Sequence, residues 1–252
     1  MNILLISGHT SGHNYSMNTK SNEGDLNIEL TKLIASYLKE YADVDIYPYD
    51  HDAYHDRREG VYLSKYDYKK YKYILEIHFN SYDGSARGAS VQLHSNYRGG
   101  ISVEREIAKA LSKYFKLRGD AGIITRDDLL NMNTALKQGV DYALLETCFH
   151  DNHKDFDTYQ MYKNDIAADI VRAIAKGFGL TNKKTKYIYV QHCDFLNLRS
   201  KPGMDGEVIG ILKPGECVVP MTYQPDSDGD YWLQVKASIK GKELTGFVWP
   251  EY

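Results

Sequence analysis

The stretch Ile3-Leu4-Leu5-Ile6-Ser7-Gly8-His9, close to the start of the chain, decides the fold class. A continuous apolar run of this length predicts a strand that is buried on both faces, and Gly8-His9 marks the loop that follows it. Similar apolar runs alternate downstream with segments of helical period. We therefore predict an α/β fold in which the N-terminal sheet is covered by helices on both faces.

The other expected elements of this sheet follow from the same two patterns. Helical spacing of apolar residues predicts helices over Ile28–Tyr41, Ile101–Phe115 and Ile166–Phe178. Short apolar or alternating runs predict strands over Val44–Tyr47, Tyr73–Phe79, Ala89–Leu93 and Tyr142–Thr147.

The pattern changes after residue 180. Residues 181–186 are polar and lysine-rich, follow Gly177 and Gly179, and are expected to be a linker. Beyond them, turn signals recur about every ten residues with no helical stretch, which is typical of a small all-β barrel. The predicted organisation is therefore a domain over 1–180, a linker over 181–186 and a barrel over 187–252.

Composition excludes several classes of function. Hydrophobic residues make up 42% of the chain, enough for a real core. The formal net charge is −3, and the residues from Thr181 onward hold nine basic and nine acidic residues, so nothing predicts the basic stripe of a nucleic-acid binder. No apolar run approaches the ~20 residues that insert into a bilayer.

The cysteines and the N-terminus bear on location. Three cysteines do not form a disulfide framework, which agrees with a reducing compartment. The first residues lack the positive n-region of a signal peptide, so we expect a protein made in the cytoplasm that needs release to act outside it.

Four polar residues stand where predicted strands end or a helix begins: His9, Glu23, His78 and Glu146. The carboxyl ends of strands form the ligand crevice of an open α/β sheet, so these side chains are candidates for one site. Two imidazoles and a carboxylate are a common catalytic zinc set, and a further carboxylate suits a general base. Taken singly, each histidine is more often structural, and Glu23 also suits the N-terminus of a helix.

A resemblance adds to this interpretation. The motifs Ser7-Gly8-His9, Asn22-Glu23 with Asn27, Glu76-Ile77-His78-Phe79-Asn80-Ser81, and Leu145-Glu146-Thr147-Cys148-Phe149 stand in the order found in zinc-dependent N-acetylmuramoyl-L-alanine amidases of the amidase-3 type. Residues 1–180 resemble this family, whose members include bacterial autolysins and phage endolysins. The resemblance implies one zinc ion held by His9, Glu23 and His78, with Glu146 as the catalytic base. It also implies peptidoglycan as the substrate, cut between N-acetylmuramic acid and L-alanine, and Asn80 is expected to contact it.

Several alternatives stay open at this point. Cys148 departs from the family motif, and a thiol so close to the site is also a candidate ligand or nucleophile. The ligand set equally suits a zinc peptidase that cuts the stem peptide, and a decayed domain would leave a non-catalytic wall-binding protein. The roles of His13 and His94 are undecided. The crowded tyrosines between Tyr62 and Tyr73 suit a glycan groove or half-buried positions on a helix that leads into a strand.

The tail has a resemblance of its own. Segments such as Leu196-Asn197-Leu198-Arg199 and Gly246-Phe247-Val248-Trp249 make residues 187–252 similar to a bacterial SH3 domain, which implies binding to the cell wall. Tyr231 and Trp249 are candidate wall contacts, although a barrel this small needs some of its aromatic rings for the core. With no signal peptide recognised, the whole pattern favours a phage endolysin that is made in the host cytoplasm and reaches the wall after release.

Overall fold

The apolar run near the N-terminus forms a central strand, β1 (Asn2–Ser7), of a six-stranded sheet. The structure is a computed structural model that describes residues 1–61, 66–97, 101–182 and 188–250. The strand order is β4-β1-β5-β8-β6-β7, and β1, β4, β5 and β8 run parallel. The other strands of the sheet are β4 (Asp43–Ile46), β5 (Tyr73–Asn80), β6 (Ser90–His94), β7 (Ile123–Arg126) and β8 (Asp141–Phe149).

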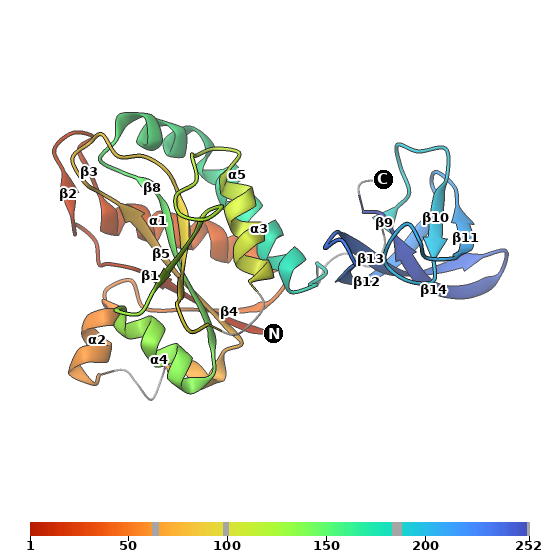
Figure 1. The fold of residues 1–252 in the computed structure, drawn as a ribbon, viewed down its shortest axis with the longest axis horizontal. Helices are drawn as coiled ribbons and strands as arrows, with labels where there is room; N and C mark the ends of the chain where they lie inside the picture. The colour runs from red at the N-terminus through yellow and green to blue at the C-terminus, as the bar shows by residue number, and fades with distance from the viewer. Residues whose placement is uncertain (62–65, 98–100, 183–187, 251–252) are drawn as a thin grey trace. The chain divides into compact units, whose positions relative to one another are not determined.

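Helices cover both faces of this sheet, as predicted (Figure 1). Leu4, Ile74 and Leu144 point to the face covered by α2 and α4, where they form one buried cluster with Met132 and Ala135 of α4. The alternate residues of the same strands are equally buried on the face of α1, α3 and α5. The helices are α1 (Glu23–Leu38), α2 (Ala53–Glu59), α3 (Ser102–Leu111), α4 (Leu130–Gln138) and α5 (His153–Gly177), with a 3-10 turn η1 (Tyr68–Lys70) and a small hairpin of β2 (Tyr15–Ser16) and β3 (Ser21–Asn22).

The predicted elements are present, with shifted ends and some omissions. The first helix begins at Glu23 rather than at Ile28, because the Asn22 side chain caps it by accepting a hydrogen bond from the Asp25 amide. The sequence interpretation did not include α2, α4 or β7. It also did not anticipate that β6 runs antiparallel to β8.

Among the described residues, the tyrosines from Tyr66 to Tyr73 do not form a glycan groove. Tyr68, Tyr71 and Tyr73 are buried, and Tyr66 packs against the cluster of α2 and α4. Tyr62 lies outside the described residues. These described rings therefore pack in or against the core, most of them more deeply than the half-buried helix face that was the alternative to a groove.

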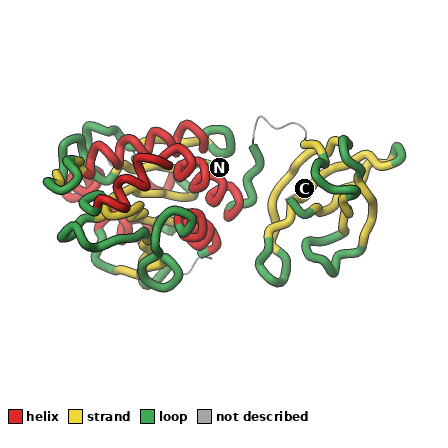
Figure 2. The backbone as a smooth tube through the Cα atoms, turned by 90° about the horizontal axis from the view of Figure 1, so that it is seen from above, coloured by secondary structure: helices red, strands yellow, loops and turns green. Residues whose placement is uncertain are grey.

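The C-terminal unit is all-β, as predicted, and no helix occurs in its described part after α5 (Figure 2). Contacts divide the chain into the units Met1–Ile174 and Ala175–Tyr252. The second unit holds a six-stranded antiparallel sheet of order β11-β10-β14-β13-β12-β9 around a core that includes Leu198, Val235 and Val248. Its strands are β9 (Ile188–Tyr189), β10 (Leu196–Arg199), β11 (Val208–Leu212), β12 (Cys217–Pro225), β13 (Tyr231–Ile239) and β14 (Lys242–Val248).

Two further predictions concern the linker and membrane-spanning segments. Most of the linker predicted over 181–186 falls in 183–187, outside the described residues. No helix in the described ranges is long and apolar enough to cross a membrane.

Candidate metal centre

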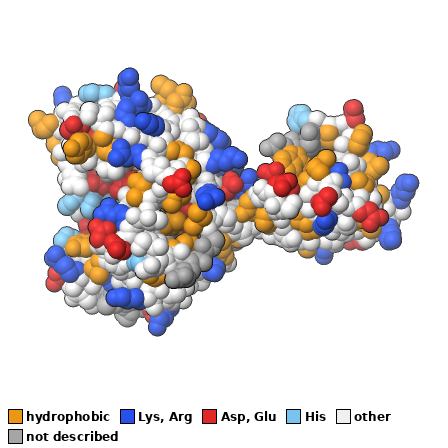
Figure 3. Space-filling view, in the orientation of Figure 1, with side chains coloured by type: hydrophobic (Ala, Val, Ile, Leu, Met, Phe, Trp, Pro, Cys, Tyr) orange, Lys and Arg blue, Asp and Glu red, His pale blue; other side chains and the backbone are white. Residues whose placement is uncertain are grey.

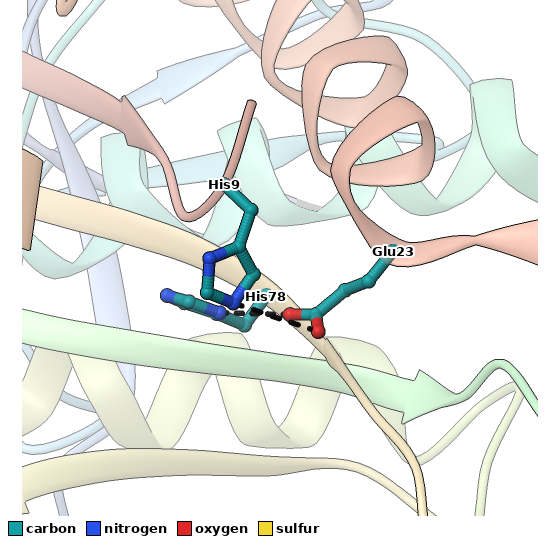
Figure 4. Close-up of side chains that lie close together, drawn as sticks. All are labelled: His9, Glu23 and His78. Carbon is teal, nitrogen blue, oxygen red and sulfur yellow. Dashed lines mark hydrogen bonds and ion pairs between the residues drawn. The ribbon is translucent and has the colours of Figure 1, made fainter. Parts of the chain in front are cut away.

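Three of the predicted site residues meet at the carboxyl end of the parallel strands. His9 lies in the loop after β1, Glu23 opens α1, and His78 is in β5. One ligand atom from each lies within 4.8 Å of the others. His78 Nδ1 is 2.8 Å from Glu23 Oε1, and His9 Nε2 is 3.6 Å from Glu23 Oε2. Figure 4 shows the three side chains pointing toward one another.

The strand pairing explains why residues so distant in sequence converge. β1 and β5 are parallel neighbours, and the Gly8 amide continues their ladder by donating to the Ile77 carbonyl at 2.9 Å. A Cβ at Gly8 would lie 2.2 Å from the His78 ring, so only glycine fits beside this imidazole. The Ser7-Gly8-His9 motif therefore has a steric reason as well as a chemical one.

The electrostatics of the cluster favour a positive charge. Burial raises the pKa of Glu23, but the hydrogen bond and the charge of His78 outweigh burial and bring this pKa down to about 2. Burial lowers the pKa of His78, but hydrogen bonds to Glu23 and Glu76 raise it well above its usual value. Both shifts have the same cause, the negative charge around His78, and a bound cation would meet that charge as well.

Two carboxylates that the sequence analysis did not select orient the histidines. His9 Nδ1 is 3.2 Å from Asp52 Oδ2, and His78 Nε2 is 3.1 Å from Glu76 Oε1. These contacts leave His9 Nε2 and His78 Nδ1 facing Glu23. Carboxylates that accept from the second ring nitrogen fix the tautomer and the direction of metal-binding histidines.

Glu76 is itself held on its other oxygen. Its Oε2 accepts hydrogen bonds from Asn131 Nδ2 at 3.1 Å and from the Tyr142 hydroxyl. Glu76 is only 4% exposed, so the carboxylate has little freedom to turn away from His78. The motif around His78 contained Glu76, but the partners that define its role stand 55 and 66 residues away in the sequence.

Removing the charge of Glu76 should weaken metal binding without unfolding the protein. We expect Glu76→Gln to lower zinc affinity by about 10–100-fold, the usual effect of losing an outer partner of a metal ligand. Competition with a chromophoric chelator measures this affinity. Glu59→Gln, at an exposed position of α2, is the matched control and should bind zinc as the wild type does; wild-type affinity in Glu76→Gln would show that Glu76 does not support His78.

Glu146 stands beside the cluster. It pairs with His78 across β5 and β8, which places both side chains on the same face of the sheet. Its Oε2 is buried and has no hydrogen-bond partner among the described residues. Burial raises the pKa of Glu146 to about 7. A carboxyl group with this pKa is suited to accept and return a proton near neutral pH.

A cavity of about 310 Å³ opens at the centre. His9 and His78 line it, together with His13, whose ring stacks on that of His9 at a centroid distance of 4.2 Å. Leu129 and Leu144 add apolar walls. Figure 3 shows histidine and acidic side chains gathered at the left edge of the N-terminal unit.

The other candidate residues of the N-terminal unit are not among the three clustered ligands. Asn80 is half-buried at the end of β5, two residues beyond His78 and on the same face, and its substrate contact stays a prediction. Cys148 is fully buried, its thiol contacts the Asp155 carbonyl, and it is not one of the clustered ligands. His94 lies at the other end of the sheet, because Ser90 is the β6 residue that pairs with Glu146. His150 is 1% exposed.

The aromatic candidates of the tail differ in exposure. Tyr231 is buried, whereas Trp249 is half-buried and lies edge-on to the buried Trp232 at 5.3 Å between ring centroids. Trp249 also lines a cavity of about 260 Å³ with Phe195. Of the two residues, Trp249 keeps more surface for a ligand, and both wall contacts stay predictions.

Comparisons with known proteins agree with this geometry. The model of the amidase-3 family, N-acetylmuramoyl-L-alanine amidase, matches residues 3–176. A Staphylococcus aureus protein named "Probable autolysin PH" is 28% identical over 200 residues, which is 73% of this chain and 41% of that protein. The chain thus spans about two fifths of the length of that curated relative.

Solved structures share the fold of the N-terminal unit. The catalytic domain of the CD27L endolysin, which targets Clostridium difficile, is 24% identical with a TM-score of 0.56, over 69% of this chain and 96% of that one. An N-acetylmuramoyl-L-alanine amidase from Clostridium difficile 630 is 17% identical with a TM-score of 0.56, over 69% and 94%. At these identities the likeness shows the fold alone.

Proposed function

Because the chain belongs to the amidase-3 family of N-acetylmuramoyl-L-alanine amidases, we propose that it hydrolyses the amide bond between N-acetylmuramic acid and L-alanine in peptidoglycan. The observation that carries the proposal is the cluster of His9, Glu23 and His78 with Glu146 beside it. Three ligands and a neighbouring carboxyl group, whose buried Oε2 has no hydrogen-bond partner among the described residues, are the parts that metal-assisted hydrolysis needs.

The donor set fits one zinc ion. Two imidazole nitrogens and one carboxylate oxygen are a usual catalytic zinc set, and three protein ligands leave a coordination position open. Bound there, zinc would polarise the amide carbonyl and make water a better nucleophile. Asp52 and Glu76 keep the two imidazoles turned toward the cluster.

Glu146 has the proton-transfer role in this proposal. Its carboxylate takes a proton from the attacking water and later delivers a proton to the leaving amine of L-alanine. Its position next to His78 brings it within reach of a bond held at the cluster. Glu146 is half-buried, and its Oε2 is closed to solvent and has no hydrogen-bond partner among the described residues, so the group has few competitors for the proton.

The position of the cut tests the proposal. Purified protein loaded with zinc is incubated with Gram-positive cell walls, and the products are identified by mass spectrometry. The proposal predicts free stem peptides with L-alanine at the amino terminus. New amino termini inside the stem would instead make the protein a peptidase, and intact walls would leave only a binding protein.

We also propose that residues 187–252 hold the enzyme on the wall, as a bacterial SH3 domain does. The cavity beside Trp249 and the half-exposed ring support this role. The proposed setting is lysis of a bacterial host as a phage endolysin. The similar fold of the CD27L endolysin domain supports this setting, while the name of the staphylococcal relative points to an autolysin.

Deleting residues 183–252 separates binding from catalysis. We expect lysis of whole walls to fall by at least about 10-fold, because a tethering contact raises the effective concentration at an insoluble polymer. Cleavage of a small soluble muropeptide should stay near the wild-type rate. Turbidity of wall suspensions and chromatography of the muropeptide measure the two; equal losses on both substrates would contradict a wall-binding role.

A further inference from the structure

A second cavity, of about 420 Å³, adjoins the metal centre. Its walls come from three segments that each carry or flank a site residue. These are the β2–β3 hairpin that leads into Glu23, the loop after β5 with Ser81 and Tyr82, and the loop after β8 with His150. The described residues that line it are all different from those that line the cavity of His9 and His13.

Asn14 connects this cavity to the cluster. It lines the cavity, and its side-chain Nδ2 donates to Glu23 Oε2 at 2.7 Å. Its backbone has φ 51°, a left-handed conformation that asparagine adopts more readily than most non-glycine residues. A molecule bound against Asn14 therefore lies next to the metal ligand Glu23.

Hydrogen bonds fix the shape of the cavity before any ligand arrives. The Asp151 carboxylate accepts from the amides of Tyr82 and Gly84 at 2.8 and 2.9 Å. The Asn18 side chain donates to the Asp151 carbonyl at 3.3 Å, and the Thr19 hydroxyl donates to the His150 carbonyl at 2.7 Å. Three loops are thus joined into one wall, which lowers the entropy cost of binding.

The chemistry of the lining suits a neutral, hydroxyl-rich ligand. Tyr15 and Tyr82 are 58% and 78% exposed, and each offers a flat ring with a polar end. Asn14, Asn18, Ser16 and Ser81 add amide and hydroxyl groups, and Asp83 and Asp151 add carboxylate acceptors. Met17 and His150 complete the lining. None of the described lining residues is a lysine or an arginine, so an anionic group would meet two carboxylates and no counter-charge.

We propose that this cavity is a sugar subsite that binds an N-acetylated amino sugar of the glycan strand, with a ring packed against Tyr82 or Tyr15. The proposal rests on the proposed function, because it assigns the sugar side of the scissile bond to the Glu23 side of the metal centre. The stem peptide then leaves through the cavity lined by His13 and Leu129.

Two substrates with the same scissile bond test the orientation. One is a muropeptide that carries the disaccharide, and the other is the corresponding lactyl-peptide, which lacks the sugars. Tyr82→Ala should raise KM for the muropeptide roughly 3- to 10-fold, as expected for one aromatic contact, and leave the lactyl-peptide unchanged. Tyr15→Ala should act in the same direction.

Two control variants complete the design. Tyr37→Ala, at an exposed position of α1, should change neither KM. Tyr54→Ala, in the lining of the other cavity, should change both, since both substrates carry the peptide. Equal effects of Tyr82→Ala on the two substrates, or none on either, would overturn the proposal.

A binding measurement separates this inference from the proposed function. Zinc-loaded full-length protein is titrated with N,N′-diacetylchitobiose, and binding is followed by NMR with wild type and Tyr82→Ala. Binding that Tyr82→Ala weakens supports the subsite even if no wall substrate is cleaved. Wild-type binding that Tyr82→Ala leaves unchanged, or the absence of binding, would reject the subsite while the amidase proposal stands on its own cleavage assay.

Discussion

Replacing Glu146 with glutamine should reduce turnover of a soluble muropeptide by about 10²–10⁴-fold, the usual contribution of a general acid–base group. The zinc content should stay at the wild-type value, because Glu146 is not one of the clustered ligands. Glutamine keeps the shape of the side chain but cannot take a proton from water. Kinetics and metal analysis on the same preparation measure both effects; nearly full activity would remove Glu146 from the mechanism.

The role of Glu146 as a base also predicts the direction in which activity changes with pH. Burial raises the pKa of Glu146 to about 7, and a cation bound at His9, Glu23 and His78 would lower it. The base form is required, so wild-type kcat/KM should rise with pH through this pKa and level off above it. The residual activity of Glu146→Gln should lack that rise.

Glu104 provides a matched control for Glu146. It is also a buried glutamate whose pKa burial raises to about 7, but it is in α3 and contacts Tyr73 at the opposite end of β5. Glu104→Gln should leave turnover unchanged. The folded state favours the protonated form of Glu104, so the stability that this residue contributes to the folded protein is lost as pH rises from 4.5 through 7. The glutamine variant should therefore be more stable than the wild type at pH 8.

Replacing Glu23 with glutamine should abolish stoichiometric zinc binding. An outer partner of a metal ligand is worth about 10–100-fold in affinity, so a ligand that contacts the metal should be worth at least about 100-fold. The substitution also removes the negative charge that faces both imidazoles, because Glu23 is the only carboxylate among the three clustered ligands. Wall cleavage should fall with the metal.

Glu29 is the control on the same helix. Its carboxylate bonds to Tyr159 and Lys163 on α5, away from the cluster. Glu29→Gln should lower thermal stability slightly and retain zinc. Competition with a chromophoric chelator compares the two variants; wild-type zinc affinity in Glu23→Gln would mean that the ligand set is wrong.

The predictable part of the site comes from buried strands that end in a polar residue. The runs before His9 and His78 are strong patterns, because a strand that is buried on both faces is apolar at nearly every position. A polar residue at the end of such a run is therefore easy to recognise. The parallel pairing of β1, β5 and β8 then brings His9, His78 and Glu146 to one edge.

What the sequence did not predict depends on contacts between distant residues. Helices α2 and α4 span only 7 and 9 residues, too short for a clear helical period. In the sequence, Glu76 resembles any other strand residue. Its role depends on the hydrogen bonds that its second carboxylate oxygen accepts from Asn131 and Tyr142. Asp52 caps α2, and only the fold shows that its other oxygen reaches His9.

The most direct test of the zinc amidase mechanism is zinc reconstitution. The protein is stripped with a chelator, zinc is returned in measured steps, and release of peptides with amino-terminal L-alanine is followed at each step. We expect no release from the stripped protein and activity that rises to a plateau at one zinc per chain. Full activity of the stripped protein, or a plateau with no zinc bound at His9, Glu23 and His78, would contradict the mechanism.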